Sequence, residues 1–405
     1  MLDVRHPPTH APERAYALDM VLGHWLGLEF SARAEERADT AISLGDDEPL
    51  VLPDGLLATP EDRWLTPESV PAAFDLDDAP GTALLLLTRY EEVARPERDA
   101  HERFPSGATL AARLGVLQRP LVDEAVQALW ERLHARWPRL ERRAPDAPRL
   151  MPSHDVDWPR PEAGALGSRL RAAAGDALRR RDPSLAWRRV RGDNVNDTFD
   201  FLMDASERRG LRSAFYFMAG RTNPEWDGDY SLDDPWIAAL LRRVDERGHE
   251  IGLHPSYETF RDPAALRAEH ERLLAACEAA GVAQRPCGGR QHFLRWENPT
   301  TWRAWAEVGL EYDASLGFSD VVGFRCGTAR EFPVFDLRAR RRLDLSERPL
   351  VVMEQALPDP AAVVPLAAAC RRAGAPLSLL WHNSKLTTRA ERVAYEATLD
   401  AALDA

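Results

Sequence analysis

The part of the chain after residue 149 repeats one unit, in which a helical stretch ends at a glycine and a short apolar stretch follows. Several helical stretches begin with Asp-Pro or Asn-Pro, a capping residue followed by proline at the first helical position. We expect helices over residues 197–209, 234–247, 263–280, 299–308, 360–373 and 388–403. Helices that alternate with strands in this way predict a parallel sheet with crossover helices.

The apolar stretches predict seven strands, at residues 150–154, 213–218, 250–254, 289–294, 311–314, 350–353 and 377–381. Seven parallel strands with crossover helices indicate a distorted (β/α)7-type barrel within the α/β class. In such barrels the functional side chains gather at the C-terminal ends of the strands. The polar residues at those ends are His154, Asp155, Asp157, His254, His292 and His382.

Residues 1–145 lack the repeated helix–glycine–strand pattern and predict a smaller mixed α/β domain that precedes the barrel. Its expected elements are a helix at 17–28, a buried strand at 83–88 and a helix at 121–137. Residues 142–149 are rich in Arg, Ala and Pro, which is typical of a linker. We therefore place a domain boundary near residue 145 and the barrel over residues 146–405. The sequence does not indicate a role for the first domain.

The composition is that of a soluble globular protein, with 44% hydrophobic and 29% charged residues in a chain of 405. The net charge of −13 argues against general nucleic-acid binding. The four cysteines contain no CxxC pair, so they fit neither a disulfide framework nor a zinc ribbon, and reduced thiols are expected. No stretch resembles a signal peptide or a membrane span, so a cytoplasmic protein is expected; its oligomeric state is not indicated.

Residues 159–193 form an arginine-rich insert between the first strand of the barrel and its helix. Because Lys385 is the single lysine of the chain, arginine clusters carry less weight here as functional signals. One interpretation of the insert is a solvated helical face. The other is a peripheral contact with anionic lipid headgroups or a phosphate-bearing glycan carrier.

Asp155 and Asp157 close the first strand, and residues two apart in a strand point to the same side. Both can therefore face one cation, with one carboxylate as a metal ligand and the other as the base that takes a proton from the attacking water. The alternative is an aspartate that caps the following helix. His254 ends the third strand, and Pro255 fixes the turn that points it into the barrel mouth as a candidate ligand.

Arg290 and His292 share one face of the fourth strand. Arg290 is expected to orient a catalytic carboxylate, and His292 to bind metal or substrate; the alternative is a hydrogen-bonded pair inside the barrel. His382, after the last strand, suits a general acid that protonates the leaving amine, or else a structural histidine. Trp381 is expected either to form an apolar wall against the substrate or to belong to the core.

Five segments resemble, in order, the motifs of polysaccharide deacetylases, the NodB-homology group of carbohydrate esterase family 4. Residues 153–157 (Ser-His-Asp-Val-Asp) resemble the family's Thr-Phe-Asp-Asp-Gly motif, and residues 254–258 (His-Pro-Ser-Tyr-Glu) its His-Ser/Thr-x-x-His motif. The other resembling segments are Arg-Gln-His-Phe at 290–293, Tyr-Asp-Ala-Ser at 312–315 and Leu-Trp-His at 380–382. The resemblance covers about residues 148–385.

By this resemblance Asp155 is the catalytic base, Arg290 orients it and His382 is the acid. Asp157 and His254 are metal ligands, and zinc is the expected ion. Because the first motif has one extra residue, the choice of base and ligand between the two aspartates stays open.

The third metal ligand also stays open. The family's second metal histidine falls at Glu258, and its motif-three proline falls at His292, so either side chain could complete the site. The N-terminal part and the run 323–330 resemble a bacterial subgroup with an extra N-terminal domain, found among enzymes of capsule and O-antigen synthesis. Arg325, within that run, is expected to contact the substrate.

Together these features predict a metal-dependent hydrolase of amide bonds that removes N-acetyl groups from a sugar or polysaccharide precursor in bacterial surface-polysaccharide metabolism. The expected partner is an N-acetylated sugar or glycan. Two alternatives stay open: another hydrolase of non-peptide carbon–nitrogen bonds on the same barrel, and a glycan-binding protein that has lost catalysis.

Overall fold

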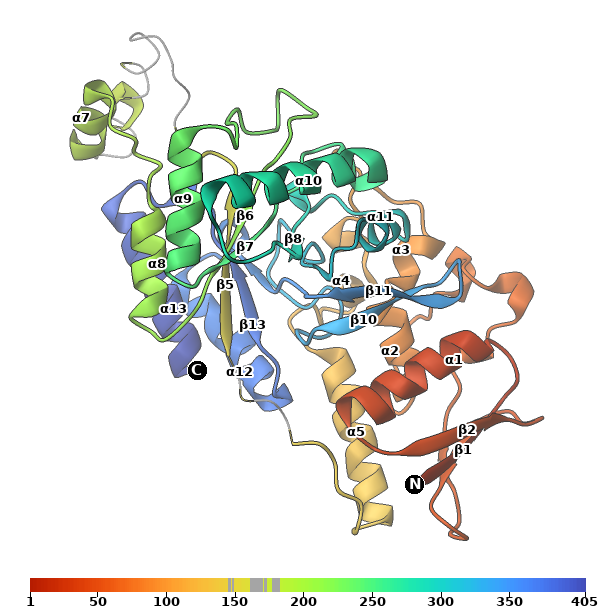
Figure 1. Ribbon diagram of the computed structural model, residues 1–405. Helices are drawn as coiled ribbons and strands as arrows, with labels where there is room; N and C mark the ends of the chain where they lie inside the picture. The colour runs from red at the N-terminus through yellow and green to blue at the C-terminus, as the bar shows by residue number, and fades with distance from the viewer. Residues whose placement is uncertain (145–146, 148, 161–169, 171–172, 177–182) are drawn as a thin grey trace.

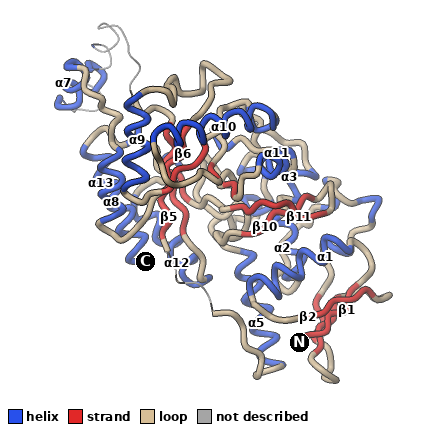
Figure 2. The backbone as a smooth tube through the Cα atoms, in the orientation of Figure 1, coloured by secondary structure: helices blue, strands red, loops and turns tan. Residues whose placement is uncertain are grey.

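A nine-stranded sheet forms the centre of the protein (Figures 1 and 2). The computed structural model describes residues 1–144, 147, 149–160, 170, 173–176 and 183–405. The strand order is β10-β11-β9-β8-β7-β6-β5-β13-β12, and all neighbours are parallel except β10 and β11. The strands are β5 Leu150–Val156, β6 Ala214–Phe217, β7 Glu250–Leu253, β8 Gly288–Gly289, β9 Tyr312–Asp313, β10 Phe332–Asp336, β11 Arg341–Glu347, β12 Val352–Met353 and β13 Leu377–Leu380.

The seven predicted strands correspond to β5, β6, β7, β8, β9, β12 and β13. They lie in one parallel arrangement from β9 through β5 to β12, which confirms the predicted α/β class and barrel-like sheet. No strand ladder joins β9 to β12 within the described residues. Instead, the Leu350 amide donates a backbone hydrogen bond of 3.0 Å to the Leu316 carbonyl and links the segments beside these strands. The barrel is therefore distorted, because β9 and β12 are not joined by a strand ladder.

The fourth strand is much shorter than predicted. β8 covers only two residues, and His292–Leu294 form a 3-10 helix in which Phe293 and Leu294 have φ of 60° and 53°. The reason lies at Gly289, where an added Cβ would stand 1.8 Å from the Leu253 carbonyl oxygen of β7. This close approach is open only to glycine. The chain then turns away from the sheet, so His292 lies over the mouth of the barrel and not within a strand.

Helices pack around the sheet as the sequence predicts (Figure 1). They are α8 Phe199–Glu207, α9 Pro235–Glu246, α10 Pro263–Ala280, α11 Thr300–Val308, α12 Val364–Ala373 and α13 Arg389–Asp404. The expected caps are present: Asp234 and Asp262 accept hydrogen bonds from amides in the first turns of α9 and α10. The predicted helix at 360–373 begins as a 3-10 helix, Pro360–Val363.

The N-terminal region, residues 1–144, carries a four-stranded mixed sheet of order β2-β1-β3-β4 and several helices. The strands are β1 Leu2–His6, β2 Phe30–Ala34, β3 Thr40–Ser43 and β4 Leu50–Leu52, and the helices are α1 Ala11–Leu18, α2 Ala79–Leu87, α3 Tyr90–Ala94, α4 Leu110–Arg113 and α5 Leu121–Arg136. The helix expected at 121–137 is α5, and the helix expected at 17–28 overlaps α1 and a π-helix, Asp19–Trp25.

The strand predicted at residues 83–88 is wrong, because these residues belong to α2. Every residue of α2 is buried, so its sequence has no polar face and reads as a continuous apolar run. Periodicity cannot separate such a helix from a buried strand. The Asp78 side chain caps α2 by accepting a hydrogen bond of 2.8 Å from the Gly81 amide.

The N-terminal region packs directly against the barrel, and their buried apolar residues form one continuous cluster. The β10–β11 hairpin lies against α1 and α2 (Figure 1), and the Tyr16 hydroxyl donates to the Pro333 carbonyl at 2.8 Å. The run 323–330 lies in the same interface, where the Phe324 amide donates to the Leu117 carbonyl at 2.8 Å. The boundary near residue 145 remains a prediction, but the two regions share a core.

A buried ionic cluster joins the two regions. Glu92 of α3 accepts hydrogen bonds from Arg89 at 2.9 Å and from Arg325 at 2.8 and 3.0 Å. Burial would raise the pKa of Glu92, but the two guanidinium groups hold it below its usual value. Arg325 is thus an interface residue. The substrate contact expected of Arg325 stays a prediction, and in the structure its side chain binds Glu92 and the Gly317 carbonyl.

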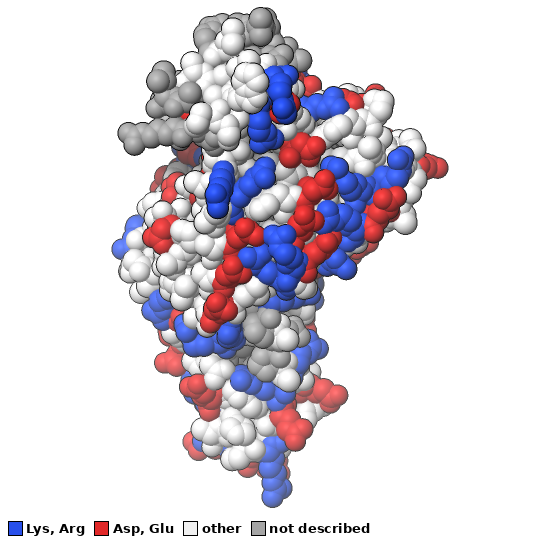
Figure 3. Space-filling model, turned by 90° about the vertical axis from the view of Figure 1, so that its left-hand side faces the viewer, with Lys and Arg blue, Asp and Glu red and all other residues white. Residues whose placement is uncertain are grey.

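Residues 161–169, 171–172 and 177–182 of the arginine-rich insert lie outside the described residues. Of its described part, α7 Pro183–Arg191 ends beside an ion pair of 2.5 Å between Arg191 and Asp193. Figure 3 shows basic and acidic side chains interspersed on one face of the molecule. At the end of α9, Arg247 pairs with Glu207 at 2.8 Å and with Asp204 at 2.5 Å. None of the described helices combines the length and apolar character needed to span a bilayer.

Replacing Glu92 by Gln keeps the side-chain volume but leaves two buried guanidinium groups without their shared carboxylate. We expect the free energy of unfolding to fall by about 3–5 kcal/mol, because removal of one partner leaves uncompensated buried charge. Urea denaturation followed by tryptophan fluorescence measures this loss. Glu97→Gln removes a carboxylate that pairs with Arg95 near the surface and should change the unfolding midpoint little. Equal effects of the two substitutions would contradict the assigned role of Glu92.

Candidate metal centre

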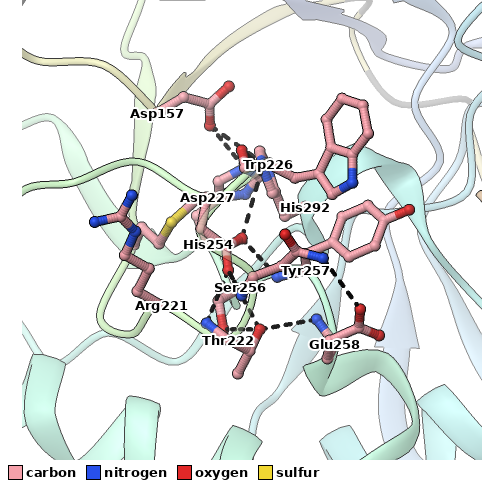
Figure 4. A network of polar contacts seen from close by, with 12 residues as sticks. Asp157, Arg221, Thr222, Trp226, Asp227, His254, Ser256, Tyr257, Glu258 and His292 are labelled. Carbon is pink, nitrogen blue, oxygen red and sulfur yellow. Dashed lines mark hydrogen bonds and ion pairs between the residues drawn. The ribbon is translucent and has the colours of Figure 1, made fainter. Parts of the chain in front are cut away.

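Three side chains from separate loops converge at the C-terminal ends of β5, β7 and β8 (Figure 4). The Asp157 Oδ1 atom lies 3.0 Å from His254 Nε2 and 3.6 Å from His292 Nδ1. The two imidazole nitrogens are 2.9 Å apart. All three side chains are buried, and they form a group able to hold a metal ion. The predicted meeting of Asp157 and His254 around one point therefore agrees with the geometry.

The tautomers of both histidines are fixed by backbone carbonyls. His254 Nδ1 lies 2.7 Å from the Arg290 carbonyl oxygen, and His292 Nε2 lies 3.0 Å from the Trp226 carbonyl oxygen. A carbonyl oxygen can only accept, so these two nitrogens carry the hydrogens. In the neutral rings, His254 Nε2 and His292 Nδ1 then present lone pairs to each other and to Asp157. Three acceptors that face one point repel one another unless a metal ion or a proton lies between them. Burial would lower the pKa of His254, but Asp155 and Asp157 raise it above its usual value.

This donor set fits a divalent transition metal such as zinc. Two imidazole nitrogens and one carboxylate are a common catalytic zinc set, and they leave a fourth position for water or substrate. Metal–ligand bonds of about 2.0–2.1 Å in a tetrahedron place the ligand atoms about 3.3 Å apart. The observed separations of 2.9, 3.0 and 3.6 Å bracket that value. The second ring nitrogens are held by carbonyl groups, as is usual around metal-bound histidines.

For the third ligand that the sequence left open, the geometry favours His292 over Glu258. The Glu258 carboxylate is about half exposed and pairs with Arg295 at 2.9 Å. It therefore points away from Asp157 and His254, as Figure 4 shows. Because β8 ends at Gly289, His292 lies in the 3-10 helix after the strand, and from there its Nδ1 atom reaches the cluster.

Asp155 lies beside the cluster but has a different partner. Its Oδ1 atom accepts a hydrogen bond of 2.8 Å from Arg290 Nη1, and its Oδ2 atom is 3.8 Å from His254 Nε2. Arg290 is itself fixed, because it also donates to the Ser153 hydroxyl and the Ala314 carbonyl at 3.0 Å each. Burial would lower the pKa of Arg290, but the Asp155 carboxylate raises it above its usual value. The two aspartates therefore differ: Asp157 faces the imidazoles and Asp155 faces the guanidinium.

His382 approaches the cluster from the end of β13. Its Nε2 atom lies 3.5 Å from Asp157 and 4.0 Å from Asp155, while Nδ1 is 2.7 Å from the Glu354 carboxylate. Burial would lower the pKa of His382, but Glu354 and the two aspartates raise it to about 10. Sequence reasoning missed Glu354. The signal was present, since Glu354 directly follows β12 and so lies at a strand end like the other site residues.

A loop after β6, residues 218–233, holds His292 in place through the Trp226 carbonyl. Asp227 accepts backbone hydrogen bonds from Thr222 at 2.8 Å, Asn223 at 2.7 Å and Tyr257 at 2.7 Å, and so ties this loop to the segment after His254 (Figure 4). Trp226 is thereby held with its carbonyl toward His292. Nothing in the sequence pattern distinguishes Asp227 from an ordinary loop aspartate.

Two other predicted residues lie away from the cluster. Trp381 is buried against Tyr395 of α13, with ring centroids 5.1 Å apart, which favours the core interpretation over a substrate wall. His154 is buried on the outer face of β5, where its Nδ1 atom is 2.8 Å from the Trp381 carbonyl oxygen. Burial lowers the pKa of His154 to about 3, which marks a neutral structural histidine.

A cavity of 330 Å³, here called the mouth cavity, opens onto the cluster. Asp155, Asp157, His292 and His382 line it together with Arg103, Trp158, Glu225, Trp226, Phe293, Leu294 and Lys385. A larger cavity of 490 Å³ lies at the opposite ends of the strands, around His249 and Glu250. It contains none of the three clustered residues, so the mouth cavity is the candidate substrate site.

Comparison with known proteins adds a distant likeness. A family of unknown function, DUF7033, matches residues 3–138, and no curated protein matches the chain. Two provisionally named polysaccharide deacetylases, from Mycobacterium smegmatis and Pseudomonas aeruginosa PAO1, are similar in structure, with TM-scores of 0.39 and 0.36 at 17% and 16% identity. Puue allantoinase has a TM-score of 0.35 at 14% identity. Each similarity covers 64% of this chain and 84–89% of the other. At this distance only the residues of the site support an argument about function.

The cluster predicts metal retention that depends on specific side chains. We expect His254→Ala and His292→Ala to lose stoichiometric zinc after loading and gel filtration, because each removes one of three ligands. Elemental analysis by mass spectrometry measures zinc per chain. Glu258→Gln is the matched control and should retain zinc, since its carboxylate pairs with Arg295. Loss of zinc from the control but not from His292→Ala would reverse the choice of third ligand.

Proposed function

We propose that the protein is a metal-dependent hydrolase that removes the acetyl group from the nitrogen of an N-acetylated sugar or polysaccharide precursor. The convergence of Asp157, His254 and His292 on one point, beside a second carboxylate held by arginine, carries this proposal. The order of the five motifs that resemble polysaccharide deacetylases supports the substrate class. We place the reaction in the cytoplasm, in bacterial surface-polysaccharide synthesis.

The roles of the two aspartates follow from their partners. When bound, a divalent cation would polarise the acetyl carbonyl and make a water molecule easier to deprotonate. Asp157 would hold that cation with the two histidines. Asp155 would accept the proton of the attacking water at Oδ2, since Oδ1 is already occupied by Arg290 Nη1. Arg290 thus fixes the direction of the base.

His382 would act as the general acid. With a pKa raised to about 10 it carries a proton at neutral pH, and Nε2 faces the cluster while Nδ1 is held by Glu354. Departure of an amine from a tetrahedral intermediate requires a proton on the nitrogen. His382 can deliver that proton, and Glu354 would orient the ring and stabilise its charge. The proposed base, Asp155, and the proposed acid, His382, therefore both lie beside the candidate metal position.

Asp155→Asn separates base catalysis from metal binding. We expect zinc to be retained, because Asp155 is not one of the clustered residues, and acetate release to fall by about 10²–10⁴-fold, the usual contribution of a general base. Acetate released from N-acetylglucosamine oligomers by zinc-loaded protein measures the rate. Asp229→Asn removes an exposed carboxylate from a neighbouring loop and serves as control. Wild-type acetate release by Asp155→Asn would refute this role.

His382→Gln tests the general acid with two substrates. We expect release of acetate from the sugar amide to fall by about 10²–10⁴-fold. Hydrolysis of 4-nitrophenyl acetate should change little, because its leaving group departs without a proton. Glu354→Gln should lower amide hydrolysis by about 10–100-fold, in line with a residue that acts through a neighbouring histidine. An equal loss on both substrates in His382→Gln would indicate a structural role instead.

A substrate screen separates the proposed activity from hydrolysis of other amides. N-acetylated hexosamine oligomers and their precursors should release acetate faster than simple non-sugar amides such as acetamide. Faster turnover of the simple amides would favour the alternative of a non-sugar amide hydrolase on this barrel.

A further inference from the structure

The N-terminal region reaches the mouth cavity through one loop, residues 95–105. The His101 ring packs against Phe293 and Trp226, with centroids 4.8 and 5.4 Å apart, and its Nδ1 atom is 2.7 Å from the Tyr257 hydroxyl. Arg295 clamps the same loop by donating to the His101 carbonyl at 3.0 Å and pairing with Glu102 at 2.6 Å. The loop is therefore a fixed part of the rim.

Arg103 is the residue of this loop that lines the mouth cavity. Its Nη1 atom donates to the Phe293 carbonyl at 2.9 Å, and its Nε atom donates to Asp99 at 2.8 Å. These bonds hold the plane of the guanidinium in place but use only part of its five N–H groups. The Nη2 atom of Arg103 also pairs with Asp99 at 2.8 Å, so a ligand in the cavity would use the remaining hydrogens of Nη1 and Nη2 on a side chain that is 17% exposed.

A second cation lines the same cavity. Lys385 ends the 3-10 helix Asn383–Lys385, directly after His382, and its side chain is exposed. Within the described part of the chain, no carboxylate forms an ion pair with its ammonium group. Lys385 is also the single lysine among 52 Lys and Arg residues. A chain that otherwise uses arginine thus keeps a compact, flexible ammonium group at this cavity.

Outside the catalytic residues, two cations and one carboxylate line the mouth cavity, and Asp99, which pairs with Arg103, does not line it. Arg103 and Lys385 contribute two cations, and Glu225 contributes one exposed carboxylate. This is the reverse of the whole protein, whose net charge is −13. Positive groups inside a concave site attract anionic ligands and fix them through charge-assisted hydrogen bonds.

We propose that Arg103 and Lys385 form a subsite for an anionic group, a phosphate or a carboxylate, carried by the substrate. The inference rests on the proposed function and narrows its substrate class to acidic N-acetylated sugars, such as sugar phosphates or uronic acids. The region that matches the family of unknown function thereby supplies a specificity-determining residue to the barrel's site.

Binding to zinc-loaded, full-length protein tests the subsite without any need for turnover. The probes are N-acetylglucosamine, N-acetylglucosamine 1-phosphate and N-acetylmuramic acid, measured by isothermal titration calorimetry. We expect at least one acidic probe to bind about 10–100-fold more tightly than the neutral sugar, and the tighter acidic probe identifies phosphate or carboxylate as the preferred group. Arg103→Gln and Lys385→Gln should each lose most of this preference.

Arg221→Gln is the matched control, since Arg221 is an exposed arginine near the site that does not line the cavity (Figure 4). It should keep the wild-type preference. Arg103→Lys, which retains the charge, should keep part of it and guards against a folding defect in Arg103→Gln. Equal binding of neutral and acidic probes by the wild type, or an equal loss in Arg221→Gln, would overturn the subsite.

The outcomes distinguish this inference from the proposed function. Preferential binding of an acidic probe without acetate release from any N-acetyl sugar would support the subsite and reject the deacetylase. Acetate release from neutral and acidic sugars with equal kcat/KM would support the deacetylase and reject the subsite.

Discussion

The site depends on two hydrogen bonds that the imidazoles of His254 and His292 make to backbone carbonyl groups. The Arg290 and Trp226 carbonyl oxygens bind one nitrogen each of His254 and His292, and so force the other nitrogens toward each other and toward Asp157. With both rings neutral this arrangement is unfavourable, because three acceptors converge in a buried space, and a metal ion or a proton on His254 relieves it. The backbone therefore specifies a cation site before any cation binds. The close contact of Gly289 with β7 and the loop tied by Asp227 are what keep those two carbonyls in place.

Arg290 connects the proposed metal ligand His254 with the proposed base Asp155. Its carbonyl orients His254, while its guanidinium holds Asp155 and also donates to Ser153 of β5 and to the carbonyl of Ala314, just after β9. The position of the proposed base and the position of one proposed ligand are thus set by a single residue. This coupling limits how far the two can move apart, and catalysis beside a metal requires such fixed distances.

Much of the barrel could be predicted from the sequence because its signals are local. Capping residues, prolines and terminal glycines mark each helix, and the rule that polar groups gather at strand ends placed Asp157, His254 and His382 together. Long-range packing was not predictable in the same way. The apolar sequence of α2 looks like a strand because the helix is buried on all sides. Arg325 looked functional because nothing local reveals that Glu92, far away in the chain, would be its partner.

The joint between the N-terminal region and the barrel has an evolutionary and practical consequence. A barrel excised near residue 145 would leave Arg325 charged and buried without Glu92, and would uncover the Phe293 and Trp226 rings that His101 packs against. Such a fragment would lose one wall of its own pocket as well as part of its core. The barrel is therefore not an independent domain. It has to be inherited, expressed and engineered together with the N-terminal region.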